Sequence, residues 1–173
     1  MGNNASEVSF ICGGGNNTAS GQWSFIGGGL GLLAKSYAET VFGSYNTDYT
    51  PANATGFNTA DRLFVIGNGT NSSNRSNAVT VMKSGNVGIG TESPKQKLHV
   101  NGQYYGRGQM WLYANEGDGL SGTAYVQARD ESGANGSDIA LQLRTQSAGS
   151  IVEAVRLTPD GNVGIGTTTP KAP

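Results

Sequence analysis

The sequence contains few cysteines, few charged residues and no long apolar run, and each of these shortages excludes a class of protein. Cys12 is the only cysteine among 173 residues, which excludes intrachain disulfides and cysteine-rich zinc sites. Its neighbours Phe10 and Ile11 predict a small buried thiol. Charged residues make up only 13% of the chain and the 11 basic residues are scattered, which argues against nucleic-acid binding. The longest apolar stretch, near Leu30 to Ala34, is far shorter than the roughly 20 residues of a membrane span. Met1-Gly2-Asn3-Asn4 does not resemble a signal peptide.

Small and turn-forming residues are abundant instead. The chain contains 28 Gly, 16 Asn, 16 Ser and 15 Thr. These residues are poor helix formers but suit tight turns, because they tolerate left-handed backbone angles or bond their own backbone. The composition therefore predicts an all-β, turn-rich protein and argues against a helical bundle or an α/β enzyme.

A repeat of 15 residues occupies the N-terminal third. Ile11, Ile26 and Val41 are spaced 15 apart, as are Ala19 and Ala34. A unit of this length holds two short strands and two turns, which is one coil of a β-solenoid with one aliphatic side chain pointing inward. Three such coils bury too little apolar surface alone, so they must be capped or share a core with other chains.

One segment of this region also allows a helix. Over Leu32 to Phe42, the side chains of Leu33, Tyr37 and Val41 would line one helical face. The preceding glycine triplet and the matching 15-residue phase favour strands instead.

The coil pattern resembles a known family. Ala19-x-Gly21-x-x-Ser24-x-Ile26-Gly27-Gly28 is similar to the head repeats of YadA-like trimeric autotransporter adhesins. The resemblance implies a trimeric β-roll with aliphatic side chains inward and small residues between the coils.

The two copies of a second repeat are more similar to each other than the 15-residue units are. Ala78 to Lys95 recurs as Ala154 to Lys171, with 11 of 18 positions identical. Each copy predicts a strand, a turn at Ser84-Gly85-Asn86 or Asp160-Gly161-Asn162, and a return strand Val-Gly-Ile. In the return strand, apolar residues alternate with glycines, which leaves one face bare for close approach of another backbone. The glycine order and the following proline exclude a dinucleotide-binding loop.

Gly-Asn-Val-Gly-Ile-Gly-Thr-x-x-Pro, present twice, resembles a module of bacteriophage tail fibres and related trimeric fibres. Asp61 to Gly69 and Lys97 to Gly102 are also typical of these proteins. The resemblance implies an interwoven trimeric neck, often followed by an intramolecular chaperone. No chaperone domain follows before Pro173, so we expect either that it was cleaved off or that the sequence is a piece of a longer protein.

Together these features predict a homotrimeric, elongated β fibre. The predicted regions are a β-roll (1–45), a connector (46–77), a first neck (78–102), a small antiparallel β domain (103–153) and a second neck (154–173). The candidates for the trimer core are Ile11, Ile26, Val41, Val87, Ile89, Val163 and Ile165.

The region 103–153 alternates apolar and polar residues over 110–113, 123–129 and 139–144, which predicts strands. Aromatic side chains here suit stacking on sugar rings, although packing in a trimer core is the alternative. The receptor-contact candidates are Tyr104, Tyr105, Trp111, Tyr113, Asn115, Asp118 and Tyr125.

The predicted function is structural and adhesive. We expect the partners to be two further copies of the chain, other tail components and a host-surface glycan or protein receptor, without nucleic acid or membrane insertion. The expected location is a virion tail or particle surface. A fragment of a bacterial cell-surface adhesin is the alternative.

We expect no cofactor, no metal and no enzymatic activity. The carboxylates that a polysaccharide depolymerase would need lie in turns, where solvated side chains are ordinary. These residues are Glu116, Asp118, Asp130, Glu131 and Asp138.

Overall fold

The computed structural model describes residues 2–6, 8–104, 106, 141–147, 150–158 and 160–171. All regular secondary structure within these residues is β-strand, which confirms the all-β prediction. The chain forms two compact units, Met1–Arg107 and Gly108–Pro173. Across the described ranges, no helix is long and apolar enough to cross a membrane.

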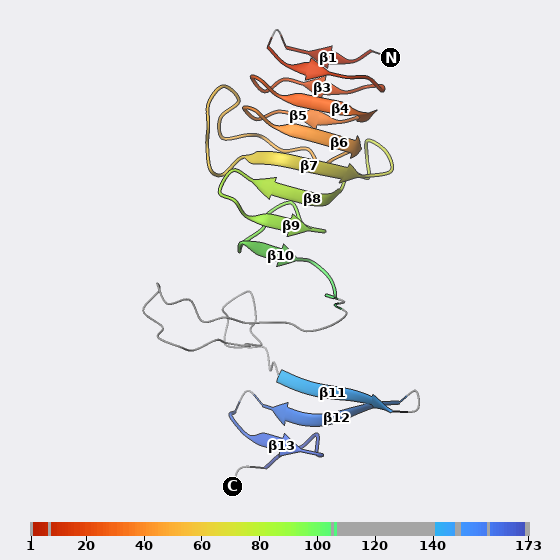
Figure 1. Cartoon of the computed structure of the whole chain (residues 1–173), viewed down its shortest axis with the longest axis vertical. Helices are drawn as coiled ribbons and strands as arrows, with labels where there is room; N and C mark the ends of the chain where they lie inside the picture. Colours follow the sequence, from red (N-terminus) through yellow and green to blue (C-terminus); the bar gives the residue numbers. More distant parts are fainter. Residues whose placement is uncertain are drawn as a thin grey trace. The chain divides into compact units, whose positions relative to one another are not determined.

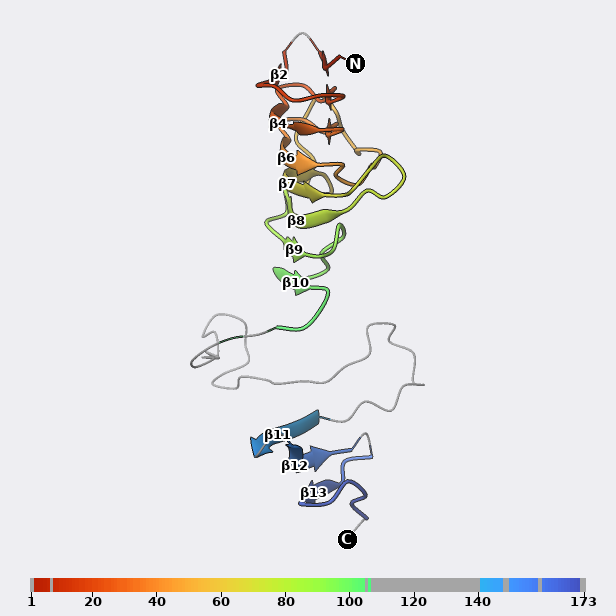
Figure 2. The same ribbon diagram turned by 90° about the vertical axis from the view of Figure 1, so that its right-hand side faces the viewer.

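The first unit is a β-solenoid that continues into the antiparallel strands β8 and β9 and a last strand, β10, parallel to β9 (Figures 1 and 2). Its strands are β1 (Asn4–Ala5), β2 (Phe10–Ile11), β3 (Thr18–Ala19), β4 (Phe25–Leu30), β5 (Leu33–Ala34), β6 (Thr40–Ser44), β7 (Arg62–Asn68), β8 (Asn77–Met82), β9 (Val87–Ile89) and β10 (Leu98–Val100). Strands β1, β3 and β5 form one parallel sheet. The other seven form a second sheet, in the order β10-β9-β8-β7-β6-β4-β2.

The register of the strands follows the 15-residue repeat. Ile11 pairs with Ile26, and Ile26 pairs with Val41, while Ala19 pairs with Ala34 in the smaller sheet. This confirms the predicted coils. The helical alternative for Leu32 to Phe42 is wrong, because that segment contributes β5 and β6 to the two sheets.

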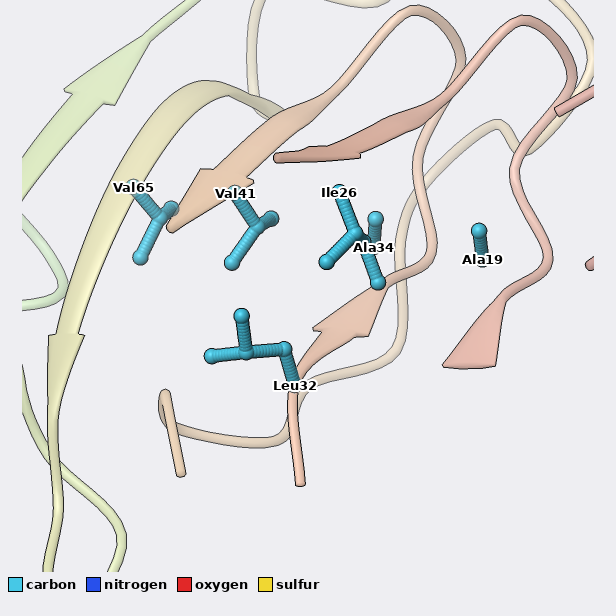
Figure 3. Close-up of a cluster of buried hydrophobic side chains, with 6 residues drawn as sticks. All are labelled: Ala19, Ile26, Leu32, Ala34, Val41 and Val65. Carbon is cyan, nitrogen blue, oxygen red and sulfur yellow. The ribbon is translucent and has the colours of Figure 1, made fainter. Parts of the chain in front are cut away.

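The solenoid core is small and lies between the two sheets (Figure 3). Its buried apolar members are Ala19, Ile26, Leu32, Ala34, Val41 and Val65, with Ile11 packed against them. Cys12 is exposed, so the prediction of a buried thiol is wrong. Side chains alternate between the two faces of a strand, and Ile11 takes the inward position beside Cys12.

Glycines and asparagines bring the coils together. A methyl group on Gly14, Gly29 or Gly43 would collide with the carbonyl oxygen of Gly29, Gly43 or Gly67 on the next coil. The buried Asn17 side chain bridges two coils, because its amide donates to Gly29 O at 3.1 Å and its oxygen accepts from Leu32 N at 2.9 Å. Inward polar side chains thus form hydrogen bonds with backbone N–H and C=O groups that the short strands leave unpaired.

The predicted connector contains a strand of the main sheet. Strand β7 runs parallel to β6, and its Val65 pairs with Val41 and joins the core. The intervening segment 45–61 lies beside the coil corners, where Gln22 N donates to Ala54 O at 2.8 Å and Tyr37 N donates to Asn53 O at 3.4 Å.

The two copies of the second repeat fold in the same way. In the first copy, β8 pairs antiparallel with β9, and Val79, Thr80 and Val81 face Ile89, Gly88 and Val87. In the second copy, β12 (Ser150–Leu157) pairs with β13 (Val163–Ile165) in the equivalent register, displaced by 76 residues.

The second unit also contains β11 (Leu141–Ser147), which forms a hairpin with β12 closed by the Ser147–Ser150 pair. This strand overlaps the run predicted over 139–144. The runs predicted over 110–113 and 123–129 lie outside the described residues.

Candidate interaction surface

A ladder of four phenylalanines runs along the outer face of the seven-stranded sheet. Phe10, Phe25, Phe42 and Phe64 come from β2, β4, β6 and β7, and successive ring centroids lie 6.1 Å apart. Each of them directly precedes or follows a residue that points into the solenoid, so strand alternation directs the ring outward. The ring of Phe42 occupies the space beside Gly27 that a larger residue would fill.

The apolar face continues across β8, β9 and β10. Phe64 pairs with Val81, and Val81 pairs with Val87. Val87 in turn pairs with Leu98 of β10. Residues paired across neighbouring strands lie on the same side of a sheet, so these side chains extend the phenylalanine ladder.

We call this surface the outer apolar face. It consists of Phe10, Phe25, Phe42, Phe64, Ile66, Val79, Val81, Val87, Ile89, Leu98 and Val100, and crosses all seven strands seen stacked in Figure 2. Phe10 and Leu98, near its two ends, are 62% and 59% exposed. Soluble monomers rarely expose a continuous apolar patch of this extent, so this face is the candidate site for association.

A cluster of charged side chains lies beneath the same sheet, where the solenoid meets β8. Lys83 Nζ donates to Ser36 Oγ at 2.8 Å and to Arg62 O at 2.6 Å. Glu39 Oε2 accepts from the backbone N of Ser36 at 2.9 Å, whereas its Oε1 is buried without a hydrogen-bond partner. Asp61 accepts from the backbone of the 45–61 segment, at 2.7 Å from Ala52 N. These contacts connect β6, β7 and β8 to the loop around them.

Burial dominates the protonation of this charged cluster. It raises the pKa of Glu39, against the opposing effects of backbone hydrogen bonds and of Arg62 and Lys83. It also lowers the pKa of Lys83, against the attraction of Asp61 and Glu39. Burial and then the Glu39 charge raise the pKa of Tyr49 to about 12. The charges are contained within the fold and serve it as an internal polar core.

Of the receptor-contact candidates, only Tyr104 lies among the described residues, and its side chain is 75% exposed. The others fall outside the described residues, namely Tyr105, Trp111, Tyr113, Asn115, Asp118 and Tyr125. So do the acidic residues considered for a depolymerase, Glu116, Asp118, Asp130, Glu131 and Asp138.

The candidates for the trimer core occupy two different environments. Ile26 and Val41 are 0% exposed inside the chain's own solenoid, beside the partly buried Ile11. Their side chains therefore have no area left to bury against another chain. The return strands expose theirs: Ile89 is 45% exposed, Val163 59% and Ile165 79%, while Val87 is half-buried.

The phenylalanine ladder was not among the residues singled out from the sequence. The signal was present, because an aromatic residue adjoins each inward aliphatic in the repeat. Phe10 and Phe25 precede theirs, whereas Phe42 follows Val41, so the ladder shifts by two residues along the strand and stays on the same face.

No group of three or more His, Cys, Asp and Glu side chains in the described parts of the chain is arranged to hold a metal ion. No protein-family model matches the sequence, and no curated protein matches it.

Proposed function

We propose that the protein is a subunit of an elongated homotrimeric fibre, carried on a phage tail or a similar particle, that contacts the host surface. The observation that carries this proposal is the outer apolar face, which extends over all seven strands of the larger sheet. The repeated Gly-Asn-Val-Gly-Ile-Gly-Thr-x-x-Pro motif supports the choice of a trimeric fibre.

The small internal core supports association. Among the residues that the structure describes, six buried apolar side chains form the solenoid core, and two of them are alanines. A chain with so little internal burial gains stability by covering its exposed apolar residues with further copies. Three copies meeting through the outer apolar face would form a second core along the fibre axis.

Three copies also present three equivalent receptor sites. Binding at one site raises the effective concentration at the others, so weak individual contacts produce firm attachment. The aromatic candidates of the region 103–153, with Tyr104 before them, are the proposed contacts to a glycan or protein receptor.

The first experiment is light scattering at several dilutions, with an unboiled gel beside it. We expect a mass of three times 17.8 kDa that persists on dilution. A folded monomer that is stable at high concentration would overturn the proposal.

A matched pair of variants tests which surface associates. Phe10 on the outer apolar face is 62% exposed, and Phe57 in the 45–61 segment is 64% exposed. Phe10→Asp should weaken the trimer and Phe57→Asp should not, because both add one charge at an exposed ring position but only Phe10 belongs to the face. Equal masses for the two variants would exclude this face as the interface.

Receptor contact is tested on an array of host-surface glycans. We expect wild-type trimer to bind members of the array and Trp111→Ala to bind more weakly while keeping the trimeric mass. Release of reducing sugar from host capsule would favour the depolymerase alternative instead.

A further inference from the structure

Two tight turns stack on each other at one corner of the solenoid. Residues 21–24 join β3 to β4, and residues 36–39 join β5 to β6. In each turn the last backbone N donates to the first carbonyl oxygen, at 3.0 Å and 3.3 Å. Ala38 N of the second turn donates to Gln22 O of the first, at 2.8 Å. Corresponding residues of the two coils therefore lie beside each other at this corner.

Trp23 holds a strained position in the first turn. It is the third residue of the turn and has a left-handed backbone, with a φ of 59°. Bulky residues rarely adopt this conformation, and turns that need it at their third position favour glycine or asparagine. The equivalent residue of the next turn, Ala38, has a φ of 51°, so the turn forms with a methyl side chain. Since the fold does not require the strained tryptophan, this outlier points to a function.

The side chain of Trp23 forms an accessible aromatic pair. It is 59% exposed, and its ring centroid lies 5.2 Å from that of the half-buried Tyr37 in the next turn, at an interplanar angle of 49°. Among the described residues, the Trp23 indole N–H, the Tyr37 hydroxyl and the Gln22 side-chain amide have no hydrogen-bond partner in the chain. The corner thus combines aromatic surface with polar groups that are available to a ligand.

The charges next to the pair are already neutralised or buried. Lys35, two residues before Tyr37, is paired with Asp48. Glu39, two residues after Tyr37, is fully buried. An anionic ligand would therefore find no unpaired cation on these neighbours, and a cationic ligand no accessible carboxylate. The surroundings favour an uncharged ligand.

The backbone groups at the corner are also occupied. Gln22 N donates to Ala54 O at 2.8 Å, and Tyr37 N donates to Asn53 O at 3.4 Å. A peptide strand that binds through main-chain hydrogen bonds needs free backbone groups, and these two donors already bond the 45–61 segment. What remains is ring surface with hydroxyl, indole and amide groups, which suits a sugar.

We propose that Trp23 and Tyr37 form a binding site for a neutral pyranose unit of a glycan. The C–H face of the sugar stacks on the Trp23 ring, and its hydroxyls bond the Tyr37 hydroxyl and the Gln22 amide. This site is distinct from the receptor-contact candidates of the region 103–153. It goes beyond the proposed function, because sugar binding here does not require the chain to form a trimer.

The first test uses the fluorescence of Trp23 in the full chain. Trp111→Phe leaves Trp23 as the only tryptophan. The probes are cellohexaose, maltohexaose and N-acetylchitohexaose, with decaproline as an uncharged peptide. We expect a saturable change in emission with at least one of the sugars and none with decaproline. No change with any sugar up to its solubility limit, or a saturable change with decaproline, would overturn the proposal.

A matched pair of variants separates the ring from the turn. Trp23→Gly and Ala38→Gly both place glycine at the left-handed position, but only the first removes an aromatic side chain. In calorimetric titrations with the sugar that binds, Trp23→Gly should weaken binding by about tenfold or more, and Ala38→Gly should not change it. Trp23→Phe keeps a ring and should retain binding, which controls for disturbance of the turn by glycine.

Light scattering and urea unfolding complete the comparison of the glycine variants. We expect the mass and the urea midpoint of Trp23→Gly to be no lower than those of wild type, because glycine relieves the strain at this position. Full sugar binding by Trp23→Gly would overturn the proposal. So would a lower mass of Trp23→Gly alone, which would assign Trp23 to a contact between copies of the chain.

Discussion

At the scale of single residues, the glycines that separate the coils are the most constrained positions. Gly28 and Gly29 both have positive φ, at 118° and 136°, so any other residue is strained at either position. Only Gly29 faces a neighbour, because a methyl group there would meet the carbonyl oxygen of Gly43, whereas the space at Gly28 is open. Substitutions at these two glycines therefore distinguish the effect of backbone strain from the effect of close contact between two coils.

We expect Gly29→Ala to lower the free energy of unfolding by about 1–3 kcal/mol more than Gly28→Ala, because only the former forces the coils apart. Urea unfolding followed by circular dichroism measures both variants. Equal losses would show that strain at positive φ, and not the contact between coils, makes glycine necessary.

The buried carboxyl of Glu39 makes stability depend on pH. Its folded pKa lies above the ordinary value of 4.5, so its contribution to stability is full below that pH. As pH rises from about 4.5 through the folded pKa, the unfolded chain releases the proton more readily and that contribution is lost. Gln at this position keeps an oxygen for the backbone N of Lys35 and Ser36 but does not ionise.

Glu39→Gln should therefore gain stability relative to wild type as pH increases above about 4.5. Urea midpoints of both proteins between pH 4 and pH 8 test this. Asp48→Asn, at an exposed carboxylate paired with Lys35, controls for the loss of one negative charge. A midpoint difference between Glu39→Gln and wild type that stays constant with pH would contradict the expectation.

At the scale of elements, the repeated motif is a hairpin followed by a turn that folds back over it. Thr91 and Pro94 cover Gly88, and Asn86 Nδ2 donates to Pro94 O at 3.2 Å. The sequence indicated that the bare glycine face admits a close neighbour. It could not indicate that the neighbour is the motif's own Thr-x-x-Pro turn, because that contact depends on where the turn directs the chain.

Gly88→Ala should displace this turn and loosen β10 behind it. The added methyl would lie 2.6 Å from Thr91 O, whereas one on Gly15 would meet only Leu30 Cδ1 at an ordinary 3.5 Å, and neither glycine has positive φ. We expect faster amide exchange at Leu98 to Val100 in Gly88→Ala and no change in Gly15→Ala. Unchanged exchange in both would mean that the turn does not hold β10.

The coils themselves could be predicted because equal spacing keeps their inward residues in phase. The next inward aliphatic after Ile11, Ile26 and Val41 could not be predicted in this way. Val65 follows Val41 by 24 residues, since the 45–61 segment is inserted between them, and the phase is lost. The same insertion explains why β7, a central strand of the sheet, lies in the region 46–77 that we predicted to be a connector.

At the scale of the whole molecule, the sequence predicted that the solenoid needs further burial, but it did not point to the outer apolar face as the surface that could provide it. Inward aliphatics are visible as a period, whereas the outer apolar face becomes continuous only after the reversal at β8 places Val79 and Val81 beside Ile66 and Phe64. A sequence repeat shows only residues that recur at a fixed spacing. This surface also includes residues of strands that run in the opposite direction, so no fixed spacing relates them to the phenylalanines.

If the outer apolar face joins the three chains, folding and association are coupled. The thermal midpoint should then rise with chain concentration, because mass action favours the associated folded state. It should change little with added NaCl, since the face consists of apolar side chains and holds no ion pair that salt would screen. Calorimetry over a hundredfold range of concentration, at low and high salt, measures both effects. A midpoint independent of concentration, or association that is lost at high salt, would contradict assembly through this face.

Phe10→Asp should reduce the concentration dependence and Phe57→Asp should preserve it, which ties the thermodynamic effect to the same surface as the mass measurement.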